Sequence, residues 1–231
     1  MWVRELAEVG VMLKDIKGCV GKCWCGWRVV RMKVLSYNSR GLGGVEKRVE
    51  LRHLIQDKHP FILCLQESKF GVINDVLIKS CWGDDPYGYS YQSSVGASGG
   101  FITVWDTSVV DVWYSMSFRH VLVIKGRVIL TDQEFVIVNV YTPCDTAAKQ
   151  ILWDQLTSLL LVDSDASICV CGDFNSVRSS KERNGKGTVF WQSDADFFNK
   201  FIDVCLLIDL PICGRLFTWY RGNGMLMSRL D

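Results

Sequence analysis

Four apolar runs of the chain each end in polar residues that a purely structural strand would not need. Asn38 follows the first run and Glu67 the second, Tyr141 closes the third, and Asp173 and Asn175 follow the fourth. Strand ends of a layered fold are where binding and catalytic residues gather. Carboxylate and amide oxygens suit Mg²⁺, which keeps several waters and needs one or two protein carboxylates plus a substrate phosphate. The pattern therefore predicts a hard-oxygen metal site.

Each of these residues alone has an ordinary structural explanation. An asparagine after a strand commonly caps a turn, and a glutamate before Ser68 and Lys69 commonly begins a helix. A functional interpretation therefore depends on the elements that would bring the residues together.

The four runs span residues 33–37, 61–65, 135–141 and 167–171. They are apolar nearly throughout rather than alternating, which predicts buried strands covered on both faces. Helical spacing follows from Val45 until His59 and Pro60, again after Asp145, and again after a capping-box pattern at Ser193–Asp196. Strands that alternate with helices indicate a layered α/β domain.

Two stretches predict antiparallel strands without helices. Residues 89–127 carry three successive strand patterns, for which a meander fits best. Residues 217–230 predict a β-hairpin, with glycines at 222 and 224 for the positive-φ positions of the turn.

Composition narrows the class of protein. The chain has 231 residues, 48% hydrophobic and 22% charged, as in a folded single domain, and its net charge of +1 supplies no global attraction to nucleic acid or membrane. No apolar run approaches a membrane span and no signal-peptide core is present, so we expect an intracellular protein. Its ten cysteines should be reduced, and Cys19, Cys23 and Cys25 match no common zinc spacing. Residues 1–31 have no clean period, and we interpret them as a poorly determined leader before a domain at 32–231.

Read as an ordered set, the motifs resemble the endonuclease/exonuclease/phosphatase superfamily. Within it, the first and last blocks look most like the endonuclease domain of plant LINE-type (non-LTR) retrotransposons. The blocks are Asn38-Ser39-Arg40-Gly41-Leu42-Gly43, Gln66-Glu67-Ser68-Lys69, Asn139-Val140-Tyr141-Thr142-Pro143, Gly172-Asp173-Phe174-Asn175, and Phe217-Thr218-Trp219 followed by Ser228-Arg229-Leu230-Asp231.

The resemblance implies a four-layer α/β sandwich of two packed mixed β-sheets flanked by helices. It also implies that Asn38 and Glu67 hold Mg²⁺ or Mn²⁺ and that Tyr141 contacts the scissile phosphate. Asp173 and Asn175 would position or activate the attacking water, and Asp231 matches the aspartate that orients the family's catalytic histidine. The implied partner is DNA, and a functional protein of this kind would be nuclear.

The family's final Ser-Asp-His motif lies downstream of the Arg-Leu-Asp block, where this sequence stops. We therefore expect a domain incomplete at its C-terminus, with the last strands of one sheet missing and hydrolysis impaired. His53, His59 and His120 are interpreted as structural rather than as replacements.

Three functions stay open. The first is a metal-dependent DNA endonuclease, and the second is a catalytically silent retrotransposon remnant that at most binds nucleic acid. The third is a phosphoesterase acting on small or lipid phosphates. Arg40 and the basic residues after the Asp173 block could contact DNA phosphates or simply form a solvated loop; those after the block are Arg178, Lys181, Arg183 and Lys186.

Overall fold

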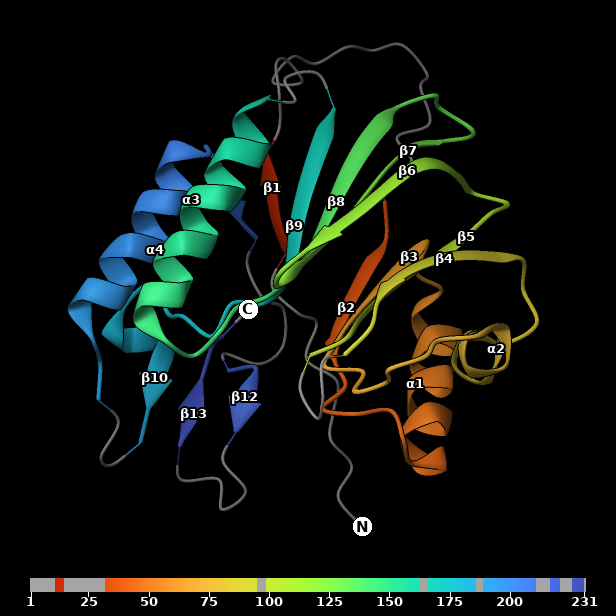
Figure 1. The fold of residues 1–231 in the computed structure, drawn as a ribbon, viewed down its shortest axis with the longest axis horizontal. Helices are drawn as coiled ribbons and strands as arrows, with labels where there is room; N and C mark the ends of the chain where they lie inside the picture. The colour runs from red at the N-terminus through yellow and green to blue at the C-terminus, as the bar shows by residue number, and fades with distance from the viewer. Residues whose placement is uncertain are drawn as a thin grey trace.

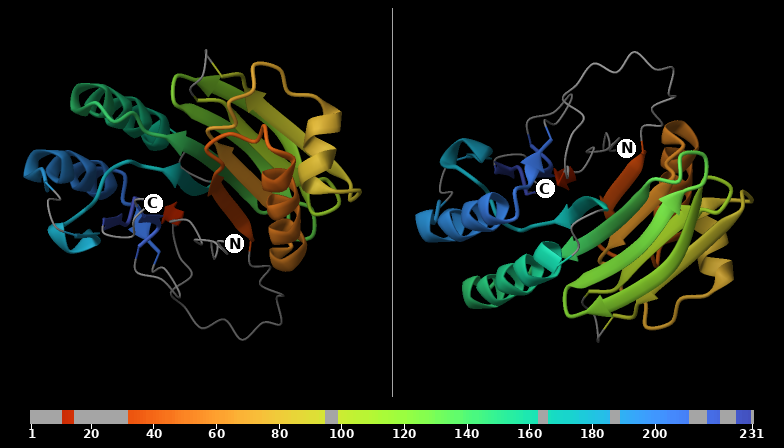
Figure 2. Two further views of the ribbon diagram at one scale, coloured as in Figure 1. Left: turned by 90° about the horizontal axis from the view of Figure 1, so that it is seen from below. Right: turned by 90° about the horizontal axis from the view of Figure 1, so that it is seen from above.

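The computed structural model describes residues 11–14, 32–94, 99–162, 166–185, 189–210, 217–220 and 226–230, with only the backbone described for 11–14. Two β-sheets pack against each other, and helices cover their outer faces (Figure 1). Figure 2 shows the layers from below and above, with α3 and α4 on one side and α1 and α2 on the other. The predicted α/β sandwich of two mixed sheets flanked by helices is confirmed.

One sheet has four strands in the order β2-β3-β5-β4. Its central strand β3 is buried along its whole length because Leu63 and Leu65 pack toward the helices while Ile62 and Cys64 pack toward the other sheet. The elements of this half are β2 (Val34–Asn38), α1 (Val45–Lys58), β3 (Ile62–Gln66), α2 (Asp75–Trp82), β4 (Tyr87–Gln92) and β5 (Phe101–Asp106).

The other sheet has six strands in the order β11-β1-β9-β8-β7-β6. Trp153 of α3 stacks on Phe201 of α4 and packs at a tilt against Phe198, and this cluster covers the outer face of β8 and β9. The elements are β1 (Val11–Lys14), β6 (Val110–Phe118), β7 (Val121–Val128), β8 (Glu134–Tyr141), α3 (Thr146–Val162), β9 (Ser167–Asp173), α4 (Gln192–Val204) and β11 (Ile208–Asp209).

A small third sheet, in the order β10-β13-β12, follows the two large ones. Its strands are β10 (Arg183–Asn184), β12 (Trp219–Tyr220) and β13 (Met227–Ser228), and a short 3₁₀ turn at Ser180–Glu182 precedes them. The antiparallel pairing of β12 with β13 confirms the predicted hairpin, whose turn at 221–225 lies outside the described residues.

The meander prediction for residues 89–127 was wrong. β4 and β5 pair in the four-stranded sheet, whereas β6 and β7 pair in the six-stranded sheet, so the chain changes sheets between β5 and β6. Alternation along a strand tells which residues are buried but not which sheet the strand joins.

Three further local features differ from the expectation. The sequence analysis missed α2, which is only eight residues long and is capped by Asn74, whose side-chain oxygen accepts a hydrogen bond from the Leu77 amide. The capping box at Ser193–Asp196 was wrong, since the N-cap of α4 is Trp191, two residues before Ser193, and it makes no side-chain cap.

A strand within the first 31 residues was also unexpected. β1 pairs with β9 and β11, so its position comes from tertiary pairing rather than from a local pattern. The rest of the predicted leader, including Cys19, Cys23 and Cys25, lies outside the described residues, and the division of the chain at residue 32 stays a prediction. In the part of the chain that the structure describes, no helix is long and apolar enough to cross a membrane. Cys64, Cys81, Cys144, Cys169 and Cys171 are free thiols in the structure, as expected.

Candidate active site

The strand ends bring the predicted residues to one edge of the two sheets. β2 and β3 run parallel, and β8 and β9 run parallel with Tyr141 opposite Asp173. The Asn38 Nδ2 atom donates to Glu67 Oε1 at 2.9 Å and to Asp173 Oδ2 at 2.8 Å. One amide therefore links a carboxylate of the four-stranded half to a carboxylate of the six-stranded half.

The backbone around Glu67 is held in an uncommon conformation. Arg40, Glu67 and Lys69 all have positive φ, at 48°, 52° and 59°. A residue with a side chain pays about 1 kcal/mol or more for this region, so such residues persist where surrounding contacts fix them. Here the Ser39 and Gly41 amides donate to the carbonyls of Gln66 and Glu67, at 2.9 and 2.7 Å. The ladder between β2 and β3 thus continues past the strand ends and fixes the direction of the Glu67 side chain.

Two lysines that the sequence analysis gave no role complete this half. Lys47 Nζ donates to the carbonyls of Ser39, Arg40 and Gly41 at 3.0–3.2 Å. Lys69 Nζ lies 3.8 Å from Glu67 Oε2. The stem of Lys69 passes close to Gly41, where a Cβ would lie 3.2 Å from the Lys69 Cδ atom. In the sequence, the only indication of a role for Lys69 was its position two residues after Glu67.

Tyr141 lies beside both carboxylates. Burial raises the pKa of the Tyr141 hydroxyl, and the Glu67 carboxylate raises it further through its charge and a hydrogen bond. The phenol therefore stays protonated at neutral pH and acts as a hydrogen-bond donor. Burial also raises the pKa of Asp173, although hydrogen bonds from Asn38 and from the Asn175 amide oppose this shift.

The loop after β9 is tied down at several atoms. The Asn175 backbone amide donates to Asp173 Oδ1 at 3.0 Å, and Asn175 Nδ2 donates to the Thr142 carbonyl at 2.7 Å. Asn175 itself has a φ of 45°. Gly172, with a φ of +144°, allows β9 to approach β8 so closely that a Cβ there would lie 1.9 Å from the Val140 carbonyl oxygen.

A buried polar pair connects the two sheets behind the site. Gln66 and Asn139 are fully buried, and Gln66 Nε2 donates to Asn139 Oδ1 at 2.7 Å and to Ser36 Oγ at 3.1 Å. Sequence reasoning missed this pair. The available signal was a polar side chain inside an otherwise apolar strand, a position that requires a partner.

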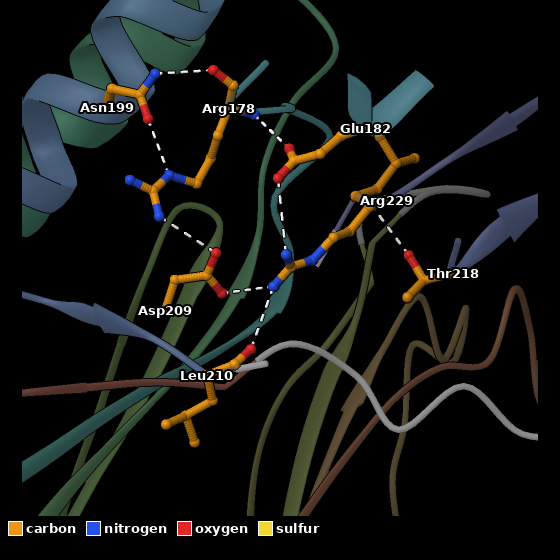
Figure 3. A network of polar contacts seen from close by, with 8 residues as sticks. Arg178, Glu182, Asn199, Asp209, Leu210, Thr218 and Arg229 are labelled. Atoms are coloured by element: carbon orange, nitrogen blue, oxygen red, sulfur yellow. Dashed lines mark hydrogen bonds and ion pairs between the residues drawn. The ribbon is translucent and has the colours of Figure 1, made fainter. Parts of the chain in front are cut away.

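Arg178, the first basic residue after the Asp173 block, is engaged in a network of polar contacts within the protein (Figure 3). Arg178 Nη1 donates to Asp209 Oδ2 at 3.3 Å, and Arg229 Nη2 donates to Asp209 Oδ1 at 2.6 Å. Glu182 closes the ring, since its carboxylate lies near Arg229 and accepts from the Arg178 amide at 2.6 Å. We call Arg178, Glu182, Asp209 and Arg229 the charged ring. The guanidinium group of Arg178, which was predicted as a possible DNA phosphate contact, is thus engaged by protein groups.

The other predicted phosphate contacts have mixed outcomes. Lys181 is exposed, Arg183 Nη1 donates to the Val189 carbonyl, and Lys186 lies outside the described residues. Asp231 also lies outside them. The residue before it, Leu230, accepts a hydrogen bond from the Phe174 amide at 2.8 Å, so the end of the described chain reaches the loop between Asp173 and Asn175.

The donor set fits a hard divalent cation. Glu67 supplies a carboxylate, and Asn38 can offer only its Oδ1, which accepts a hydrogen bond from the Arg40 amide, because its Nδ2 faces the carboxylates. Across the described ranges, no cluster of three or more His, Cys, Asp or Glu side chains could surround a metal. One or two carboxylates with several waters suit Mg²⁺ or Mn²⁺ better than Zn²⁺, which takes three or four protein ligands.

The sequence profile of the Endonuclease/Exonuclease/phosphatase family matches residues 34–231. The chain belongs to this family. Among curated proteins, an exodeoxyribonuclease of Bacillus subtilis is 24% identical over 185 residues, covering 74% of this chain and 71% of the relative. The family's general chemistry is phosphodiester hydrolysis.

Solved structures of two AP endonucleases have the same fold at low sequence identity. An AP endonuclease from Archaeoglobus fulgidus aligns with a TM-score of 0.59 at 14% identity, over 75% of this chain and 71% of its own. The AP endonuclease LMAP from Leishmania major aligns with a TM-score of 0.57 at 16% identity, over 75% of this chain. This chain spans 66% of the length of LMAP. At these identities the likeness establishes the fold.

Proposed function

We propose that this protein is a divalent-metal-dependent DNA endonuclease domain derived from a LINE-type retrotransposon. The observation that carries the proposal is the Asn38 amide bridging Glu67 and Asp173 across the two sheets. Family membership and the printed activities of the relatives, an exodeoxyribonuclease and AP endonucleases, support a DNA substrate. The retrotransposon origin is supported by the motif blocks at 38–43 and 217–231, and it implies action in the nucleus.

The residues divide the chemistry between the two halves. Glu67, with Asn38 Oδ1, would hold Mg²⁺ or Mn²⁺, which supplies positive charge to a non-bridging phosphate oxygen. The protonated Tyr141 hydroxyl donates a hydrogen bond to the phosphate. Asp173 accepts a proton from the attacking water as the new P–O bond forms. The P–O bond to the leaving sugar oxygen breaks, and that oxygen takes up a proton from water. The raised pKa of Asp173 makes it a better base than an ordinary carboxylate. Asn175 orients the water or the phosphate, and Asp231 would orient a histidine.

A second candidate is a remnant that binds nucleic acid without cleaving it. Its support is the placement of the three histidines: His53 is exposed on α1, His59 ends α1, and His120 lies in the β6–β7 turn. The side chain of Asp173 accepts its hydrogen bonds from Asn38 and Asn175 rather than from a histidine. A site without its general acid or base typically loses about 10²- to 10⁴-fold in rate.

Plasmid nicking separates these functions. We expect nicking of supercoiled DNA that requires Mg²⁺ or Mn²⁺ and falls at least about 10²-fold in Glu67→Gln, because the variant loses the metal's charge stabilisation. The matched control is Glu46→Gln, an exposed glutamate in the first turn of α1, which should leave nicking unchanged.

Two other outcomes would each support one of the alternative functions. Nicking no faster than background by both the wild type and Glu67→Gln, together with equal DNA binding, would identify the silent remnant. Metal-dependent hydrolysis of a small phosphodiester without DNA nicking would identify the small-substrate phosphoesterase.

A further inference from the structure

A buried ammonium lies directly behind the candidate catalytic loop. Lys149 is only 5% exposed, and its Nζ donates to the Asn175 carbonyl at 2.6 Å and to Asp194 Oδ2 at 2.8 Å. Asp194 also accepts from Ser176 Oγ at 3.3 Å. Three segments therefore meet here, namely the first turn of α3, the first turn of α4 and the loop after β9.

The position of Lys149 runs against what its own helix would prefer. Lys149 occupies the first turn of α3, where the helix dipole disfavours a positive charge. Asp194 occupies the first turn of α4, where the dipole favours a negative charge, and its carboxylate contacts Lys149 and Ser176. Moving two charges out of water adds a desolvation cost that the attraction between them need not recover. The stability of α3 alone thus gives no reason for a buried lysine at this position.

The pair acts on a residue whose backbone amide and side-chain nitrogen are already held by hydrogen bonds. The Asn175 amide is bound to Asp173, and its side chain is bound to the Thr142 carbonyl. Lys149 supplies the bond to the third group, the carbonyl, and so helps to hold the left-handed backbone at Asn175. Asp194 orients and neutralises the ammonium that makes this bond.

We propose that Lys149 and Asp194 are positioning residues that set Asn175 and Asp173 for phosphodiester hydrolysis. The proposal rests on the proposed function. Reacting groups displaced by about 1 Å can lose about 10²-fold in rate, so a loosened Asn175 loop should lower catalysis without changing affinity for DNA. Neither residue touches the substrate.

The decisive variant removes both charges together. Lys149→Met alone leaves the Asp194 carboxylate without its ion-pair partner, so this variant should lower both the urea midpoint and the nicking rate. In Lys149→Met/Asp194→Asn no buried charge is left unpaired and Ser176 keeps an acceptor, so the urea midpoint should return close to the wild-type value. The single-turnover nicking rate should stay about 10²-fold low with KM unchanged.

An exposed ion pair on the four-stranded half serves as the control. The exposed pair on the other half, changed as Lys79→Met/Asp84→Asn, should alter neither measurement. Recovery of both midpoint and rate in the Lys149/Asp194 double variant would overturn the positioning role and leave a purely structural pair. Should Lys149→Met prevent folding, Asp194→Asn alone is compared with the wild type under conditions in which both are folded. Its nicking rate should still fall, and a lower urea midpoint would not account for that loss.

Hydrogen exchange keeps the positioning claim testable even if the proposed function fails. If the wild type nicks no faster than Glu67→Gln, the nuclease assignment is lost, and exchange at residues 174–177 decides the structural claim. We expect exchange there to be at least about 10-fold faster in the double variant, with β9 unchanged, because the loop loses its anchor. Unchanged exchange at 174–177 would overturn the claim.

Discussion

The two halves of the candidate site hold their residues in different ways. In the four-stranded half, Glu67 is aimed by main-chain hydrogen bonds that extend the β2–β3 ladder, and its neighbouring cation, Lys69, is 42% exposed. In the six-stranded half, the Asp173–Asn175 loop is bound by the buried Lys149–Asp194 pair, and its Phe174 amide donates to Leu230, the neighbour of Arg229 of the charged ring. Substitutions near Glu67 should therefore change ligand binding, whereas substitutions around Asp173 should also change stability.

The largest difference is expected between two glycines, one from each half. Gly172→Ala places a Cβ 1.9 Å from the Val140 carbonyl oxygen at a φ of +144°, so it should lower the free energy of unfolding by about 4 kcal/mol or prevent folding. Gly43→Ala has no atom within 4 Å of its new Cβ and should stay within about 0.5 kcal/mol of the wild type. Urea unfolding measures both. Similar losses of unfolding free energy in the two variants would contradict the difference in packing between the two halves.

A smaller difference is expected between two ion pairs. Arg229 is 19% exposed and contacts both Asp209 and Glu182, so Arg229→Met leaves two largely buried carboxylates without it and should cost about 3 kcal/mol. Lys79 is 62% exposed in its pair with Asp84, and Lys79→Met should cost less than about 1 kcal/mol. Equal costs in urea unfolding would show that the charged ring is no more than a surface feature.

The smallest effect concerns pH. Burial lowers the pKa of His120, and the charge of Arg119 lowers it further. Below the ordinary pKa of 6.5 the unfolded chain then binds more protons than the folded chain, so stability falls as pH falls from 6.5 through the lowered pKa. His120→Asn, which suits the positive φ at this position, should make the urea midpoint less sensitive to acid. An unaltered pH dependence, matching that of the control His53→Asn, would contradict this.

Much of the frame could be predicted from the sequence because it depends on local patterns. The continuous apolar runs that became β3, β8 and β9 are buried on both faces, and a strand in that position has a characteristic apolar composition. The run that became β2 lies at the edge of its sheet, and three of its five residues are only half-buried. α1, α3 and α4 carry a helical period. Polar residues just beyond such strands stand out, which is why Asn38, Glu67, Tyr141, Asp173 and Asn175 were found together.

What the sequence could not predict are contacts between distant segments. The sheet change between β5 and β6, and the pairing of β1 with β9, depend on which partner strand is present in space. Lys149 and Asp194 each look like ordinary helix residues, and their meeting requires α3 and α4 to be packed first. The charged ring likewise joins residues from three separate segments, at 178–182, 209 and 229 (Figure 3).

A metal site based on Glu67 is tested most directly by Mn²⁺ titration followed by electron paramagnetic resonance of the free ion. The wild type should bind one Mn²⁺, Glu67→Gln should bind at least about 10-fold more weakly because it removes the principal charged ligand, and the exposed Glu46→Gln should match the wild type. Equal Mn²⁺ affinity in the wild type and Glu67→Gln would contradict a metal site at this edge of the two sheets.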